Sequence, residues 1–266
     1  MKLLVTDIDD TLSVGDNVSG EVSDACASLV ENGWDIMIAS GRSFFTAKNH
    51  IKAAHATQPA ILYDGARTMN LDGSEIESVT MNPLLVSEVL KFLWPLPSEI
   101  QIACDEFILC RADDAATSRF YKKSGVEVRY IDSPSFMEET SFDHPVYRVA
   151  LWATPDIFRR IEGSICEAFD RRAEIVPGGT EFLDILAKGV SKGDAFDRFL
   201  SRLPARPEII VVAGDHLNDI EILRRADIAA APENAHRRVL EIADFIMPTA
   251  REDGIKVLAK RLLSGE

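Results

Sequence analysis

Short apolar runs alternate with stretches of helical periodicity in the first and last parts of the chain. The runs LLVTD (residues 3–7), DIMIAS (35–40) and EIIVVAGD (208–215) predict strands, and the last is apolar enough to be buried on both faces. Residues 19–32 place apolar side chains on one helical face, and Gly33 follows as a stop signal. Because alternating strands and helices are joined by right-handed crossovers, the pattern predicts a mostly parallel sheet with helices on both faces.

The same patterns place further elements beside this sheet. AILYD (60–64) is expected to be its third strand, and TMNLDGSEIES (68–78) predicts a hairpin with Asp72-Gly73 at the turn. Four further helices are predicted, at 41–54, 191–203, 218–226 and 234–243.

Residues 82–187 break the alternation. Here strand-like runs follow each other closely, as in QIACDEFILCR (101–111), and helices fall before and after them. This segment predicts an α+β unit with its own antiparallel sheet, and the first pattern resumes after Gly189. The expected fold class is therefore α/β, a parallel-sheet core of residues 1–81 and 188–266 interrupted by an inserted α+β domain.

The charge balance limits the partners of the protein. Lys and Arg total 29 against 43 Asp and Glu, which argues against general nucleic-acid binding but leaves room for a small anionic substrate. The four cysteines form no C-x-x-C pair, and no apolar run approaches the length of a membrane span or a signal peptide. We expect a soluble cytoplasmic protein with reduced thiols, no membrane partner, and either a monomeric or a homodimeric state.

Polar clusters fall where the strands of the parallel sheet end or where the following helices begin. In open α/β sheets, ligands bind outside the carboxyl ends of the strands. Each cluster alone is a weak signal, because a D-x-D turn or a lone lysine is common on protein surfaces. Their order along the chain makes coincidence a poor explanation. The clusters are Asp7-x-Asp9-Asp10-Thr11, Ser40-Gly41-Arg42, Lys192 in GVSKGDAF, and GDHLND with Asp215, Asn218 and Asp219.

The acidic members of these clusters suit a hard cation. Carboxylates of Asp7, Asp9 and Asp215 that lie close together are costly unless a cation neutralises them, and oxygen ligands favour Mg²⁺. A carboxylate facing a metal-bound phosphate can act as a nucleophile and form an aspartyl-phosphate. A second carboxylate two residues on lies on the same side of an extended backbone, where it can serve as general acid and base.

The hydroxyl and cationic members suit an anion. Ser40, the backbone N–H groups of Gly41 and Arg42, and Lys192 are expected to form a phosphate cradle at a helix N-terminus. The clustered acids are therefore expected to bind a cation and to react with a phosphoryl group that the hydroxyl and cationic residues hold.

These residues resemble a known family. TDIDDTL, ASGR, the lysine of GVSKGDAF, and GDHLND resemble the four motifs of the haloacid dehalogenase (HAD) superfamily of phosphohydrolases. ILYDGA, FLDILAKGVSKG, PENA and ADFIMPTAREDGI look like its Cof-type branch, whose large α/β cap is inserted after the third strand of a Rossmann-like core. The resemblance implies a Mg²⁺-dependent phosphatase that acts through an aspartyl-phosphate on a small phosphorylated metabolite, such as a sugar phosphate or a phospho-acid. It also implies that the inserted domain determines substrate specificity.

The resemblance carries roles onto individual residues. Asp7 is implied as the nucleophile and a Mg²⁺ ligand, and Asp9 as the general acid and base that also offers its backbone carbonyl to the metal. Asp215 completes the metal ligands, and Asp219 supports the metal from a second shell or through water.

The same resemblance assigns the phosphate contacts. Ser40 and Lys192 are implied to hold the phosphoryl oxygens, and Lys192 also offsets the charge of Asp7. Asn218 is implied to reach the phosphate or to orient Lys192.

Two residues depart from the family pattern. Asp10 stands where the family usually has glycine, and we interpret it as a turn residue that points away rather than as an addition to the metal site. Asp64 stands where the family often has asparagine; it either caps its loop, as an asparagine does, or disfavours very anionic substrates.

Other functions remain open at this point. A phosphotransferase or mutase uses the same aspartyl-phosphate but passes the group to another hydroxyl. A non-catalytic phosphometabolite-binding protein usually lacks the acids at positions 7 and 9, which are present here. A receiver-type signalling domain carries its acceptor aspartate after the third strand and has no hundred-residue insert, so the order of the motifs disfavours it.

Overall fold

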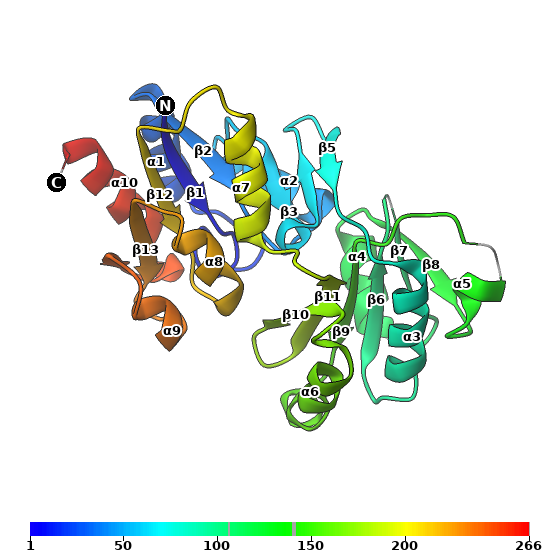
Figure 1. Cartoon of the computed structure of the whole chain (residues 1–266). Coiled ribbons are helices and arrows are strands. Elements are labelled where there is room, and N and C mark those ends of the chain that lie inside the picture. The colour runs from blue at the N-terminus through cyan, green and yellow to red at the C-terminus, as the bar shows by residue number, and fades with distance from the viewer. Residues whose placement is uncertain (106, 140–141, 266) are drawn as a thin grey trace. The chain divides into compact units, whose positions relative to one another are not determined.

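The computed structural model describes residues 1–105, 107–139 and 142–265. The chain divides into two compact units, one formed by Met1–Glu77 together with the chain from Ser191 onward, the other by Ser78–Val190 (Figure 1). The predicted fold class, a parallel-sheet core interrupted by an inserted α+β domain, is confirmed. The inserted unit, residues 78–190, is a few residues longer at each end than the segment 82–187 that the sequence suggested.

The first unit is built on a parallel sheet with the strand order β14-β13-β12-β1-β2. Strand β1 lies between β12 and β2, and its partners are in register from Lys2 to Thr6. The strands are β1 (Lys2–Thr6), β2 (Trp34–Ile38), β12 (Ile209–Ala213), β13 (Ile228–Pro232) and β14 (Phe245–Met247).

Helices cover both faces of this sheet because successive side chains of each strand point to opposite sides. Leu4 of β1 joins a buried cluster with α1, α2 and α10, whereas Leu3 and Val5 join one with α7, α8 and α9. Three-layer packing of this kind confirms the predicted arrangement. The helices are α1 (Gly20–Glu31), α2 (Phe44–Ala53), α7 (Lys192–Arg202), α8 (Ile220–Leu223), α9 (Arg237–Leu240) and α10 (Gly254–Ser264).

The predicted third strand does not extend the parallel sheet. Strand β3 (Ala60–Leu62) instead belongs to a separate sheet of order β3-β4-β5, where it pairs antiparallel with β4 (Arg67–Met69). An isolated parallel bridge between Ala39 and Ile61 links it to the segment after β2, where the Ser40 N–H donates to the Ile61 carbonyl (2.9 Å). The predicted hairpin is confirmed: β4 and β5 (Glu75–Ser78) flank a turn that contains Asp72-Gly73.

Helices near the ends of the strands are shorter than the sequence predicted. Helix α2 begins at Phe44 rather than at Gly41, because the Ser43 hydroxyl caps it by accepting the Thr46 N–H (3.3 Å). The helix predicted at 218–226 is a 3₁₀ turn, η2 (Leu217–Asp219), followed by α8, and that predicted at 234–243 is reduced to α9. Two short 3₁₀ turns complete this unit, η1 (Tyr63–Gly65) and η3 (Ala250–Glu252).

The second unit has a mixed sheet with the strand order β10-β11-β9-β6-β7-β8, antiparallel except for the parallel pair β7 and β8. Helices α3 and α6 pack on one face of this sheet and share its main buried cluster. Its strands are β6 (Glu99–Ala103), β7 (Phe107–Arg111), β8 (Glu127–Ile131), β9 (Arg148–Trp152), β10 (Ala173–Gly178) and β11 (Phe182–Ala187). Its helices are α3 (Pro83–Leu93), α4 (Ala115–Lys123), α5 (Phe136–Glu139) and α6 (Pro155–Phe169).

Across the described ranges of both units, no helix is both long enough and apolar enough to cross a membrane.

Candidate active site

Three neighbouring strands deliver polar residues to one edge of the parallel sheet. Asp7 follows β1 directly, and its backbone N–H donates to the Ala213 carbonyl at the end of β12 (2.9 Å). Ser40 lies two residues beyond β2, and Asp215 two residues beyond β12. In this sheet β2 lies on one side of β1, and the later strands β12, β13 and β14 lie on the other. Such a reversal of strand order is the position at which open α/β sheets bind their ligands, and these residues meet there.

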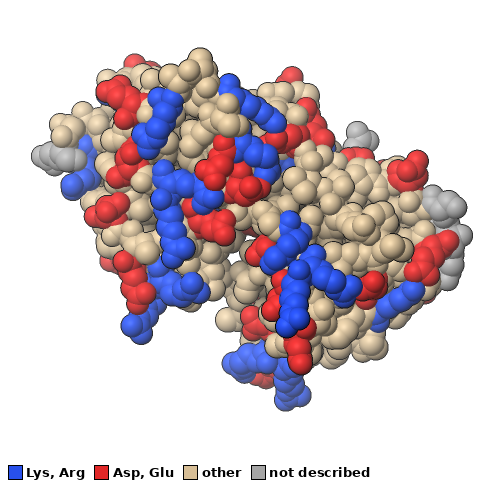
Figure 2. All heavy atoms as spheres, in the orientation of Figure 1, with Lys and Arg blue, Asp and Glu red and all other residues tan. Residues whose placement is uncertain are grey.

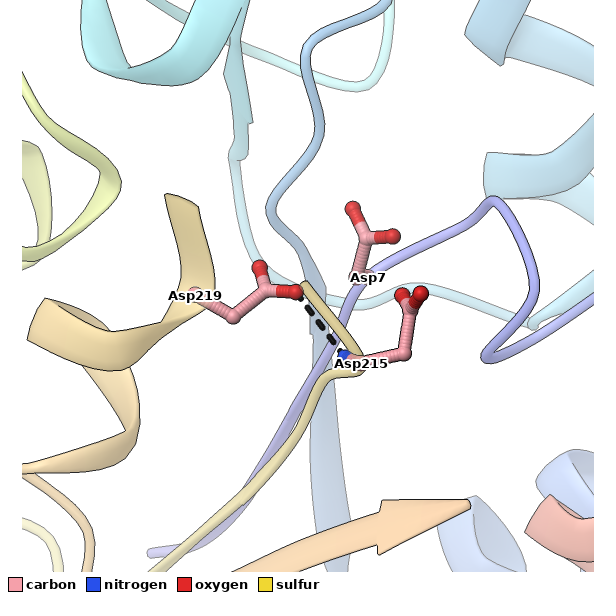
Figure 3. Close-up of side chains that lie close together, drawn as sticks. All are labelled: Asp7, Asp215 and Asp219. Carbon is pink, nitrogen blue, oxygen red and sulfur yellow. Dashed lines mark hydrogen bonds between the residues drawn. The ribbon is translucent and has the colours of Figure 1, made fainter. Parts of the chain in front are cut away.

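Three carboxylates gather at this edge. Asp7, Asp215 and Asp219 each offer an oxygen, and these oxygens all lie within 4.8 Å of one another. Figure 3 shows the side chains of Asp7 and Asp215 next to each other, with Asp219 approaching from its own helical turn. Asp7 and Asp219 are buried, with 7% and 1% of their surface exposed, so the repulsion between the carboxylates is poorly screened by water.

Lys192 ties two of these acids together. It is the first residue of α7, whose N-cap Ser191 accepts the N–H of Asp194 (3.0 Å). Its Nζ donates to Oδ1 of Asp7 and to Oδ1 of Asp219, both at 2.7 Å. Burial alone lowers the pKa of Lys192, but the surrounding carboxylates outweigh this effect and raise it well above the ordinary range. The lysine is therefore a permanent cation between the acids.

Asp219 shapes the loop that carries Asp215. Its Oδ2 accepts the backbone N–H groups of Asp215 (3.0 Å) and His216 (3.1 Å), and its Oδ1 accepts Lys192. Gly214 fits the same arrangement, because a β-carbon there would lie 2.6 Å from Cγ of Asp219. With both oxygens occupied, Asp219 fits a supporting position better than direct metal ligation.

The remaining acids fit a divalent cation. Burial raises the pKa of Asp7 well above its ordinary value; Lys192 counteracts this, while Asp219 and Asp215 add to it. Burial and Asp219 raise the pKa of Asp215 to about 7, against a hydrogen bond from Thr11 Oγ1 to its Oδ1 (3.0 Å). Carboxylate oxygens of Asp7 and Asp215 thus lie close enough to share a cation, and hard oxygen donors in excess of positive charge suit Mg²⁺.

Asp9 is not a member of this close group of carboxylates, although its charge adds to the raised pKa of Asp7, and it is paired with Arg42. The guanidinium binds both oxygens of the carboxylate, Nε to Oδ2 at 2.9 Å and Nη2 to Oδ1 at 2.6 Å. Arg42 also donates to the Gly15 carbonyl (3.0 Å), which fixes the loop after the first acids. The Asp9 side chain is about half exposed, whereas that of Arg42 is mostly buried. Asp9 therefore has access to solvent while its orientation is set by Arg42.

Ser40 and Gly41 lie in the segment before α2, whose N-cap is Ser43. The predicted phosphate cradle therefore lies in this loop and not at the N-terminus of a helix. The buried Ser40 hydroxyl accepts the backbone N–H of Arg42 (3.3 Å). Gly41 lies against Asp64, and Asp64 accepts a hydrogen bond from Nδ2 of Asn218 (2.8 Å). The second and fourth polar clusters are thus linked through Asp64.

Asp10 has a left-handed backbone conformation, which is the conformation that glycine adopts most easily. Its φ angle is 56°, its side chain is exposed, and its N–H donates to the Ser13 carbonyl (2.9 Å). Aspartate tolerates the left-handed region better than most residues. The interpretation of Asp10 as a turn residue therefore agrees with the structure, although its charge also contributes to the raised pKa of Asp215.

Three contacts of the site were not foreseen from the sequence. Thr11 bonds Asp215, Arg42 pairs with Asp9, and Asp64 bonds Asn218. The presence of Thr11 and Arg42 inside two motifs was a usable signal. The partner of Asp64 lies 154 residues away and gave no local signal.

Comparison with known proteins identifies the family of the chain. A family model described as haloacid dehalogenase-like hydrolase matches residues 4–258, so the chain belongs to that family, as its motifs predicted. An HMP-PP phosphatase of Yersinia enterocolitica is 22% identical over 88% of this chain and 84% of its own. A 5-amino-6-(5-phospho-D-ribitylamino)uracil phosphatase of Bacillus subtilis is 22% identical over 96% and 93%. A solved structure described as a HAD subclass IIB sugar phosphatase superposes with a TM-score of 0.81 at 22% identity, covering 98% of this chain and 99% of its own.

Proposed function

We propose that the protein is a Mg²⁺-dependent phosphatase that hydrolyses a small phosphorylated metabolite through an aspartyl-phosphate on Asp7. The observation that carries the proposal is the buried Lys192 bridge between Asp7 and Asp219, with Asp215 beside it. This arrangement holds one carboxylate oxygen of Asp7 in place and leaves the other for reaction. Relatives described as phosphatases of small phosphorylated compounds support the substrate class.

In the proposed first step, the free oxygen of Asp7 attacks phosphorus and the bond from phosphorus to the leaving oxygen breaks. Asp9 must first leave the ion pair with Arg42 and take up a proton from solvent, to which its side chain is about half exposed, and it then gives this proton to the leaving oxygen. In the second step Asp9 takes a proton from water, which attacks phosphorus and releases phosphate and the Asp7 carboxylate. Asp7, Asp215 and the backbone carbonyl of Asp9 would hold Mg²⁺, which would neutralise charge on the phosphoryl oxygens.

The other residues bind and orient the phosphoryl group in this proposal. Lys192, the Ser40 hydroxyl and the backbone N–H groups of Gly41 and Arg42 are its donors, and Asn218 contributes its amide. The inserted unit, residues 78–190, is proposed to select the substrate, and a sugar phosphate or a phospho-acid is the class we favour. The face in Figure 2 carries Lys and Arg mixed with Asp and Glu, which gives no continuous basic strip for nucleic acid on that face.

Phosphate release from a panel of phosphorylated metabolites, with Mg²⁺ and with EDTA, tests the proposal. Release that requires Mg²⁺ supports hydrolysis, and the ranking of the panel narrows the substrate. A folded protein that binds Mg²⁺ and releases phosphate from no member contradicts the proposal. Phosphate that appears on an added alcohol instead of in solution indicates transfer.

A further inference from the structure

The loop Tyr63–Gly65 has an unusual backbone. Tyr63, Asp64 and Gly65 follow one another with φ angles of 48°, 52° and 104°. A left-handed conformation is unfavourable for a residue with a β-carbon, above all for an aromatic one, and it persists only where the surroundings enforce it. Strain of this kind clusters at functional sites, so the position of each side chain in the loop is informative.

Neighbouring elements hold the loop in this conformation. The N–H groups of Tyr63 and Asp64 donate to the carbonyls of Arg42 and Ser40, each at 3.2 Å. Gly65 lies so close to α7 that a β-carbon would be 2.1 Å from the Ser191 carbonyl oxygen. The loop is thus fastened to the segment after β2 and to the start of the helix that begins with Lys192.

The strained loop delivers the Asp64 carboxylate into the phosphate site. Only 2% of Asp64 is exposed, and its Oδ1 accepts Nδ2 of Asn218 at 2.8 Å. A β-carbon placed on Gly41 would lie 2.9 Å from its Oδ2. The charge of Asp64 acts on Lys192 together with those of Asp219 and Asp7. Asp64 therefore contacts two of the proposed phosphate-binding residues and influences a third.

We propose that Asp64 is a positioning and specificity residue, which selects phosphate monoesters whose remainder is uncharged or cationic. This inference rests on the proposed function. A carboxylate only accepts hydrogen bonds, so it fixes the Asn218 amide with its nitrogen toward Asp64 and leaves the carbonyl oxygen and the second N–H for other partners. An asparagine at position 64 accepts or donates and leaves the amide orientation open.

The negative charge of Asp64 determines which substrates are disfavoured. Lys192 is already shared by Asp7 and Asp219, so a further buried carboxylate increases the negative surplus of the site. Each additional anionic group on a substrate is repelled by that surplus. Asp64 thus weakens the binding of every phosphate ester and penalises a phospho-acid more than a sugar phosphate.

The test is the substitution Asp64→Asn, which removes one charge, keeps the size of the side chain and tolerates the same backbone conformation. Asp72→Asn is the matched control, because Asp72 is an exposed carboxylate in the turn of the β4–β5 hairpin of the same unit. Inorganic phosphate is titrated into each protein by calorimetry, with and without Mg²⁺. We expect phosphate to bind about tenfold more tightly to Asp64→Asn and unchanged to Asp72→Asn.

A second comparison tests selectivity and the route through Asn218. We expect Asp64→Asn to lower KM more for a phosphoglycerate than for a hexose 6-phosphate. Asn218→Ala and the double variant should show non-additive effects on kcat/KM, because the two side chains act together. Equal changes in KM for the two esters overturn the proposed selectivity. Additive effects on kcat/KM overturn the proposed coupling of Asp64 with Asn218.

The two proposals fail in different ways. If the wild type hydrolyses no ester, the proposed function fails, but the phosphate titration still decides whether Asp64 sets anion affinity. If phosphate binds Asp64→Asn and the wild type equally, or binds neither, the role of Asp64 is wrong whatever the panel of esters shows.

Discussion

Replacing Asp7 by asparagine removes the proposed nucleophile while it preserves the shape of the side chain. We expect Asp7→Asn to lower kcat by at least about a thousandfold, because it removes the carboxylate oxygen that is proposed to attack phosphorus. The loss is informative only if the variant folds. The geometry of the site indicates that it does.

The electrostatic contributions to folding nearly cancel. At an effective dielectric constant of about 20, the contact of Asp7 with Lys192 at 2.7 Å is worth about 6 kcal/mol, which the substitution loses. The repulsion of Asp7 by Asp219, across no more than 4.8 Å, amounts to about 3.5 kcal/mol, Asp215 repels Asp7 by a similar amount where it is ionised, and the substitution relieves both. The burial cost of the charged carboxylate also disappears. The metal-free variant is therefore expected to be at least as stable as the wild type.

The assay combines thermal unfolding with phosphate release on the best substrate of the panel, with Asp72→Asn as control. The expected result is an unchanged or raised Tm in EDTA, a loss of turnover in Asp7→Asn and full turnover in the control. A folded variant that retains wild-type turnover refutes the assignment of the nucleophile. A Tm that falls by more than about 8 °C refutes the electrostatic argument.

Three further perturbations test other parts of the account. Arg42→Lys loses the two-point contact with Asp9 but keeps its backbone N–H, so we expect steady-state kinetics to show kcat about tenfold lower and calorimetry to show little change in phosphate affinity. Since the pKa of Asp215 is raised to about 7, the metal-free protein should hold a proton on Asp215 below pH 7, which Mg²⁺ must displace. Calorimetry should show Mg²⁺ affinity rising with pH up to about 7, and a pH-independent affinity contradicts this. Burial and Arg42 lower the pKa of His50 from 6.5, so its stabilising contribution is present above pH 6.5 and is lost as the pH falls. The Tm difference between wild type and His50→Gln should shrink on acidification, and a constant difference refutes the shift.

The sequence predicted the layers of the core because they depend on periodicity alone. Leu3 and Val5 alternate with Leu4 along one strand, and such alternation with helices between strands has few solutions. The third strand was misplaced because AILYD is as apolar as a core strand, whereas its pairing with Arg67–Met69 is decided by the hairpin that follows. Local pattern does not encode which edge a short strand joins.

The sequence predicted those site residues that directly follow the strands of the parallel sheet. Asp7 and Asp215 meet because their strands are neighbours in a parallel sheet. The pairing of Asp9 with Arg42 and of Asp64 with Asn218 depends on how loops from different strands pack, which no spacing in the chain reports. The strained backbone at Tyr63 and Asp64 was equally invisible, because neither residue type signals a positive φ as glycine does.

The aspartyl-phosphate on Asp7 is the central claim, and trapping it is the most direct test. Wild-type protein is mixed with substrate and Mg²⁺, quenched in acid within milliseconds, digested and analysed by mass spectrometry. The account predicts a phosphoryl group on the peptide that contains Asp7, formed only with Mg²⁺ and absent from Asp7→Asn. A phosphoryl group on another residue, or turnover that persists in Asp7→Asn, contradicts it.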